Sequence, residues 1–145
     1  STADAAGAKL GTLICFEVTR PDLARQMRRE GASVLVQLSN ETWFGPTAAA
    51  HQMLSQCVFR AVENNTELVR ATNSGASAKI DRFGLVSGET SLFEPATRVW
   101  GLQSVQDAGQ NELTFYSRHG DVFAAGCLIA SVAILVSCLA VKTKF

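Results

Sequence analysis

The residue with the clearest chemical potential in this sequence is Cys15, near the end of the apolar run TLICF at positions 12–16. Such a run predicts a buried strand, and the crevices of α/β sheets open at the carboxyl ends of strands. A thiol in that place could act as a nucleophile once a neighbouring base or cation has deprotonated it. Glu17 could handle a proton, although a carboxylate beside a thiol disfavours the thiolate. The alternative is that Cys15 is a small buried hydrophobe of a core strand.

Two further loops carry polar and aromatic residues directly after predicted strands. One is SNETWFGP at positions 39–46, and the other lies within VRATNSGAS at positions 69–77. Taken singly, Trp43 and Phe44 are typical of aromatic residues that pack in a core or a loop. Taken together with Cys15, the two loops predict the rim of an active site. The substrate-binding candidates on this rim are Asn40, Trp43, Phe44, Gly45, Arg70, Thr72 and Asn73.

Alternating strands and helices are expected to position these loops. Pro21 opens a predicted helix that Gly31 ends, and residues 48–64 carry apolar side chains at helical spacing. Strand, helix, strand, helix, strand is the signature of an α/β fold. The first ten residues are small and polar and predict a loop or a cut end. Strands are expected at residues 12–16, 33–38, 68–72, 76–80, 85–86 and 98–105.

Composition excludes two kinds of partner. In 145 residues, 13 Lys and Arg balance 13 Asp and Glu. A basic face that releases counterions from phosphate is therefore not expected, and neither is a nucleic-acid partner. The four cysteines form no CxxC pair and the chain has two histidines, so we expect no metal and no other cofactor. Parity permits a Cys15–Cys57 disulfide if the domain is extracytoplasmic.

The segment at positions 122–141 is an uninterrupted run of 20 uncharged, mainly apolar residues. As a helix it would extend about 30 Å, which matches the hydrocarbon core of a bilayer. A buried core helix is the alternative, but such helices are usually shorter and carry a polar stripe. We therefore predict a transmembrane helix at 122–141, after a domain at 1–121 and before a short tail at 142–145.

The charges that flank this segment favour one orientation. Lys142 and Lys144 follow the segment, whereas Arg118 alone among Arg and Lys residues lies close to its N-terminal end. Positive charge collects on the cytoplasmic side of membrane helices. The tail is therefore expected in the cytoplasm and the domain outside it.

Several blocks of the sequence resemble the carbon–nitrogen hydrolase (nitrilase) superfamily, and more closely its membrane-anchored branch, the apolipoprotein N-acyltransferases. The most specific blocks are the Cys-aromatic-Glu group of LICFE and the Asn-x-x-Trp-Phe-Gly group of SNETWFG. An apolar segment directly after Gly120 and Asp121 distinguishes this branch from soluble nitrilases. The blocks occur in order at positions 13–17, 31–32, 39–45, 52, 60–63, 69–75 and 114–121.

The resemblance implies a four-layer α-β-β-α sandwich, of which this chain is the C-terminal half, and a Glu-Lys-Cys triad. It implies that Cys15 takes an acyl chain from a phospholipid as a thioester. The acyl chain then passes to the N-terminal amine of a diacylglyceryl-cysteine lipoprotein. The backbone N–H of Phe16 is the implied oxyanion donor. Glu17 matches a required acidic residue, and Trp43 and Phe44 are implied to border the acyl cleft.

The Glu and the Lys of the triad belong to the upstream half of the family's domain. We therefore expect this segment to be the C-terminal portion of a larger enzyme, inactive without its N-terminal half. The implied location is the bacterial inner membrane, with the catalytic part on the periplasmic side. The implied partners are a phospholipid acyl donor, a lipoprotein acceptor and the membrane. Two alternatives stay open: an amidase- or nitrilase-type carbon–nitrogen hydrolase, and an inactive membrane-tethered remnant.

Overall fold

The computed structural model describes residues 2–5, 7–103 and 112–142, and a six-stranded sheet with strand order β1-β2-β3-β4-β5-β6 forms its centre. β2, β3 and β4 are parallel neighbours, whereas β1, β5 and β6 pair antiparallel. The register pairs Ile14 with Leu38 and Ser39 with Thr72, so the carboxyl ends of the three parallel strands meet at one edge of the sheet. The strands are β1 (Thr2–Ala5), β2 (Ala8–Ile14), β3 (Val34–Ser39), β4 (Leu68–Thr72), β5 (Ala78–Ile80) and β6 (Val86–Ser87).

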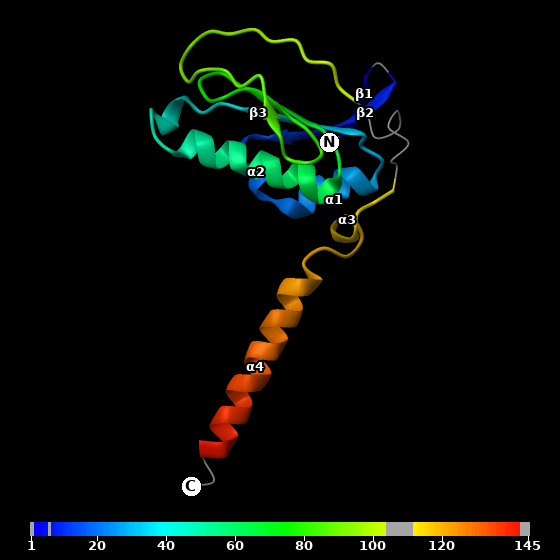
Figure 1. The fold of residues 1–145 in the computed structure, drawn as a ribbon, viewed down its shortest axis with the longest axis vertical. Coiled ribbons are helices and arrows are strands. Elements are labelled where there is room, and N and C mark those ends of the chain that lie inside the picture. The colour runs from blue at the N-terminus through cyan, green and yellow to red at the C-terminus, as the bar shows by residue number, and fades with distance from the viewer. Residues whose placement is uncertain (1, 6, 104–111, 143–145) are drawn as a thin grey trace.

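Two helices, α1 (Pro21–Arg29) and α2 (Ala49–Asn64), cover one face of the sheet (Figure 1). Pro21 occupies the first turn of α1, as expected, and Asn65 ends α2 in the left-handed conformation with φ 48°. The core between sheet and helices includes Leu13, Leu35, Leu68 and Ile80 from the strands, and Ala24, Met27, Met53, Cys57 and Ala61 from the helices. One sheet and one helical layer make half of the expected α-β-β-α sandwich.

The opposite face of the sheet carries exposed apolar side chains. Leu13 is fully buried while its neighbour Ile14 is 51% exposed, and Gln37 is fully buried while Leu38 is 43% exposed. This alternation follows from the strand period, which sends successive side chains to opposite faces. An exposed apolar face of this kind is what one sheet of a two-sheet sandwich presents to the other.

Two expectations about the start of the chain are wrong. Residues 2–5 and 8–10 do not form a loop but pair as β1 and the beginning of β2, across a turn in which Gly7 has φ 80°. Small residues are compatible with a strand when a neighbouring strand supplies the hydrogen bonds. In addition, β2 ends at Ile14, and Cys15–Thr19 form the short 3-10 helix η1.

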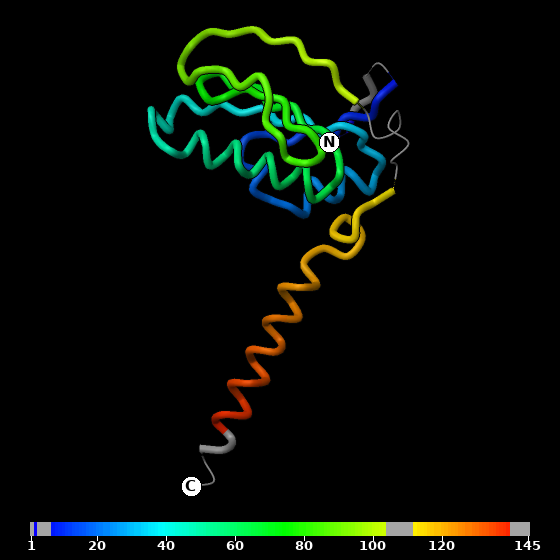
Figure 2. Tube along the Cα trace, viewed as in Figure 1, coloured from blue at the N-terminus to red at the C-terminus, as the bar shows by residue number. Residues whose placement is uncertain are grey.

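The strand expected at 98–105 is also wrong over the part that the structure describes. Residues 98–103 form no strand, and 104–105 lie outside the described residues. Val99 is 94% exposed, and the indole of Trp100 packs so closely on Gly88 that a Cβ atom there would overlap it. The segment after β6 therefore passes over the sheet as a long loop instead of joining it (Figure 2).

The C-terminal part consists of a short helix α3 (Phe115–His119) and a long helix α4 (Val122–Lys142) that extends away from the sheet (Figure 1). Thr114 caps α3 and also donates from Oγ1 to the carbonyl of Glu63 at 2.6 Å, which ties α3 to the end of α2. Within α4, Val122–Leu139 has mean hydropathy 2.6 and none of it is buried in the described structure. α4 is long and apolar enough to cross a membrane.

Candidate active site

The loops that follow β2, β3 and β4 meet at the carboxyl edge of the sheet, as their positions in the sequence predicted. Asn73, after β4, connects two of them: its Nδ2 donates to Asn40 Oδ1 at 2.8 Å and to Thr42 Oγ1 at 2.9 Å. Its Oδ1 accepts from the backbone N–H of Glu41 at 3.0 Å. An open, shallow depression at this junction is lined by Cys15, Asn40, Thr42 and Trp43.

Cys15 occupies a strained backbone position directly after β2. Its φ of 52° lies in the left-handed region, which residues other than glycine rarely adopt and which clusters at functional sites. The turn is held on both sides: Glu17 Oε2 accepts from the N–H of Ile14 at 2.8 Å, and Gln37 Nε2 donates to the carbonyl of Cys15 at 3.3 Å. A sharp strand-to-helix turn of this kind presents a nucleophile at the top of a sheet. The carboxylate of Glu17 therefore supports the backbone of the cysteine turn.

Three aromatic rings gather beside the cysteine. Phe16 meets Trp43 edge-on with ring centroids 5.8 Å apart and Phe44 edge-on at 5.9 Å, and Trp43 stacks on Phe44 at 5.3 Å. Trp43 is 68% exposed and donates from Nε1 to the carbonyl of Asn40 at 2.9 Å. Phe16 and Phe44 continue into a second hollow that Gln52 and Met53 of α2 also line. The rings thus offer an apolar surface next to the thiol.

Arg70 lies beneath the depression and not on its rim. Its side chain is fully buried and forms an ion pair with Glu41, which is 1% exposed. Nε donates to the carbonyl of Ala76 at 2.9 Å and Nη1 donates to Gln37 Oε1 at 3.1 Å. The expectation that Arg70 belongs to the substrate-facing rim is therefore corrected, because a fully buried guanidinium reaches the site only through its neighbours.

Gly45 and Thr72 shape the backbone of the two loops. Gly45 has φ 61° and ψ −169°, a combination that is essentially restricted to glycine, and it ends the short helix η2 (Thr42–Phe44). The N–H of Thr72 donates to Ser77 Oγ at 3.0 Å. These contacts assign both residues a local structural role.

Gln37, Glu41 and Thr42 were not among the predicted site residues. The sequence holds a signal for Gln37, because it is a polar residue inside the apolar strand VLVQL. A polar side chain that points into a core requires a hydrogen-bond partner. The partner lies 33 positions further along the chain, so periodicity alone does not reveal it.

Cys57 differs from Cys15 in exposure. Both are free thiols in the structure, so the disulfide that parity permitted is not formed. Cys57 is fully buried, and this burial raises the pKa of its thiol to about 11. Cys57 is therefore protonated and inaccessible near neutral pH, whereas Cys15 opens to the depression.

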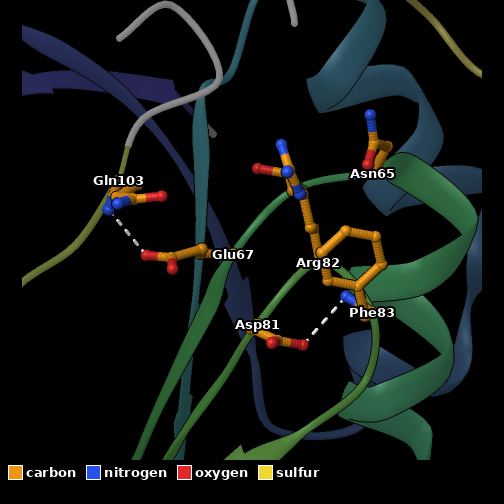
Figure 3. A pocket seen from close by; sticks show the side chains of 7 residues that line it. Asn65, Glu67, Asp81, Arg82, Phe83 and Gln103 are labelled. Atoms are coloured by element: carbon orange, nitrogen blue, oxygen red, sulfur yellow. Dashed lines mark hydrogen bonds between the residues drawn. The ribbon is translucent and has the colours of Figure 1, made fainter. Parts of the chain in front are cut away.

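Another hollow lies at the opposite end of β4 (Figure 3). Its two carboxylates accept from backbone N–H groups: Glu67 from Gln103 at 2.7 Å and Asp81 from Phe83 at 2.9 Å. Glu67 also pairs with Lys79 at 2.9 Å. Since Glu67 precedes β4 and the depression follows it, this hollow is separate from Cys15.

Known proteins resemble the chain in sequence. The sequence profile of the carbon–nitrogen hydrolase family matches residues 1–110. The apolipoprotein N-acyltransferase of Geobacter metallireducens is 41% identical over 141 residues, which are 97% of this chain and 26% of that protein. Apolipoprotein N-acyltransferase 1 of Treponema denticola is 35% identical over 137 residues, 94% of this chain and 24% of that protein. The chain thus spans about a quarter of the length of these curated relatives.

Solved structures resemble the fold. Saccharomyces cerevisiae Nit3, a member of the nitrilase superfamily, superposes with TM-score 0.54 at 25% identity and covers 66% of this chain and 38% of its own. A carbon–nitrogen hydrolase from Helicobacter pylori G27 has TM-score 0.55 at 17% identity, over 62% of this chain and 39% of its own, which supports the fold alone. The profile match extends over the whole described sheet, and the chain therefore belongs to the carbon–nitrogen hydrolase family.

Proposed function

We propose that this chain is the C-terminal part of an N-acyltransferase that moves an acyl chain from a phospholipid to a lipoprotein. The observation that carries the proposal is the placement of Cys15 on a strained turn, open to a depression and beside three aromatic rings. The names of the curated relatives support the same activity. Residues 1–121 would then form a partial catalytic domain.

The first half-reaction is thioester formation. The thiolate Sγ of Cys15 attacks the ester carbonyl carbon of the phospholipid, so that a C–S bond forms. The ester C–O bond breaks, and the lysophospholipid leaves as an alcohol after taking up a proton. Negative charge develops on the carbonyl oxygen during the attack, and the N–H of Phe16 is the proposed donor that stabilises it.

The second half-reaction returns the enzyme to its starting state. The unprotonated N-terminal amine of the diacylglyceryl-cysteine attacks the thioester carbon, so that a C–N bond forms and the C–S bond breaks. The amine loses a proton and Cys15 regains one. Because the two substrates bind in turn to the same thiol, the kinetics are ping-pong.

The general base and the lysine of the triad are proposed to come from an N-terminal half of the domain. The exposed face with Ile14 and Leu38 fits the second sheet of the sandwich that this half would supply. The segment on its own is therefore expected to be inactive. No metal or other cofactor is needed for either half-reaction.

The membrane is the proposed third partner. Residues 122–141 would span the bacterial inner membrane, with residues 142–145 in the cytoplasm and the catalytic part on the periplasmic side. α3 is bonded to α2 through Thr114 and Ser117, so the domain is held directly above the start of α4.

The test uses a full-length enzyme that carries this segment. Cys15→Ser is expected to abolish transfer, so that diacylated lipoprotein accumulates, while Cys127→Ala in α4 serves as the matched control and keeps activity. Retained triacylation by Cys15→Ser would refute the proposal. Incubation with phospholipid and a diacylated lipopeptide separates transfer from hydrolysis: an N-acylated peptide supports the acyltransferase, and release of free acid alone supports an amidase-type hydrolase.

A further inference from the structure

The peptide group between Cys15 and Phe16 is anchored on its carbonyl side by a buried side chain. It is trans, so its C=O and N–H point in opposite directions. Gln37, whose side chain is fully buried, donates from Nε2 to the carbonyl of Cys15 at 3.3 Å. Because this bond draws the carbonyl toward the core, the N–H of Phe16 is directed away from it.

The orientation of the Gln37 amide depends on Arg70. An amide carries a donor end and an acceptor end, and either end could face Cys15. A guanidinium is a donor only, and Arg70 Nη1 donates to Gln37 Oε1 at 3.1 Å. This contact leaves Nε2 for the Cys15 carbonyl. With the amide reversed, two oxygens would face one another and the peptide group would lose its anchor.

Arg70 is itself held in one position. Its guanidinium pairs with Glu41 and donates from Nε to the carbonyl of Ala76 at 2.9 Å, and the side chain is fully buried. Gly75 provides the room for the Glu41 carboxylate, because a Cβ atom at Gly75 would lie 2.9 Å from Glu41 Cδ. Charge-assisted bonds in a buried setting are strong and directional.

From these contacts we infer that Gln37 and Arg70 are positioning residues that aim the N–H of Phe16 at the oxyanion of the acyl-transfer reaction. They act through the carbonyl of Cys15 and touch no substrate. The inference rests on the proposed function, since it takes Cys15 as the nucleophile. In this arrangement the buried ion pair of Arg70 and Glu41 serves the reaction by holding Arg70 against the Gln37 amide.

The test compares two reactions of Cys15 in a full-length enzyme that carries this segment. Thioester formation from phospholipid develops an oxyanion, whereas alkylation by iodoacetamide does not. Gln37→Glu replaces the donor by an acceptor of the same shape, and Gln37→Met removes the polar end at similar length. Losing one oxyanion donor costs about 10²–10³-fold in kcat, so a misdirected donor is expected to lower the thioester-forming rate by about 10²-fold. The alkylation rate of Cys15, read by mass spectrometry, is expected to change less than about threefold, because the thiol itself is untouched.

The rate of thioester formation is divided by the amount of enzyme whose Cys15 reacts with iodoacetamide. A variant that folds in low yield therefore still gives a rate per molecule of reactive enzyme. Arg70→Lys keeps a cationic donor near Gln37 and is expected to retain more thioester formation than Arg70→Met. Gln26→Glu, the same chemical change on the exposed side of α1, is the matched control and keeps the wild-type rate.

Two outcomes would overturn the inference: thioester formation at the wild-type rate in both Gln37 variants, or equal loss of thioester formation and alkylation, which indicates general damage to the turn. Cys15→Ser separates the two proposals. If it still transfers acyl groups, the proposed function fails; if it is inactive while the Gln37 variants are normal, the positioning role alone fails.

Discussion

The side-chain amide of Asn73 donates to Asn40 Oδ1 at 2.8 Å, across loops that are 33 positions apart in the chain. The other end of the Asn73 amide, Oδ1, accepts from the N–H of Glu41 at 3.0 Å. One side chain thus fixes the distance between the loop after β3 and the loop after β4, and both loops border the depression at Cys15.

Asn73→Ala is expected to loosen this junction. It removes hydrogen bonds that each contribute about 1 kcal/mol net to stability. The rings of Phe16, Trp43 and Phe44 are then free to shift. Acyl transfer should fall while the fold is retained, as measured by turnover and by thermal unfolding of the same preparation. Ser55→Ala on the exposed side of α2, which removes a single local bond to His51, is the control. Unchanged turnover in Asn73→Ala would show that the loops do not need this connection.

Breaking the buried pair of Arg70 and Glu41 is expected to destabilise the domain. Glu41→Gln keeps the shape but leaves the Arg70 charge uncompensated, and removing one partner of a buried pair costs about 3–5 kcal/mol. Denaturant unfolding measures the loss. Arg20→Met breaks the exposed pair of Arg20 with Asp22 and should leave the stability nearly unchanged, because water screens that pair. Equal stability of the Glu41→Gln and Arg20→Met variants would contradict the importance of the buried pair.

Gly75→Ala tests the space behind the same carboxylate. The added methyl group would lie 2.9 Å from Glu41 Cδ and 3.0 Å from Thr72 Oγ1, so the ion pair must shift. Overpacking of this kind costs about 1–3 kcal/mol. Gly101→Ala is the matched control, since nothing in the described structure lies within 4 Å of a Cβ atom there. Unfolding temperatures of the two variants should therefore separate, and coinciding temperatures would refute the expectation.

Cys57 is expected to make the stability depend on alkaline pH. Burial raises its pKa to about 11, above the ordinary value of 9.0, so the folded protein binds the proton more tightly than the unfolded chain. The resulting contribution of Cys57 to the free energy of unfolding is complete below the ordinary pKa. It declines as pH rises from about 9 toward 11, by at most about 1.4 kcal/mol per pH unit. Unfolding measured between pH 8 and 10.5 should show a shallower decline for Cys57→Ala than for the wild type. Parallel curves for the two proteins would exclude this role.

Local sequence was sufficient for the elements whose signals are local. The β-branched run before Ser39 became β3, Pro21 opened α1, and α2 extends over most of the helix expected at 48–64. The apolar stretch from Val122 became one long helix. The parallel arrangement then placed the residues after β2, β3 and β4 at one edge, as the order of strands and helices predicted.

Pairing between distant segments was beyond the reach of local patterns. Residues 2–5 became a strand because β2 lies beside them, and residues 98–103 did not because Trp100 packs on Gly88 instead.

The sequence by itself determined the nucleophile candidate, the loops around it and the family. Only the tertiary structure decided that Arg70 is buried beneath the site, paired with Glu41 and bonded to Gln37. The physical reason is that the spacing of apolar residues along the sequence indicates only which face of a helix or strand is buried. The partner of a buried polar group instead depends on chain segments 29 and 33 positions away.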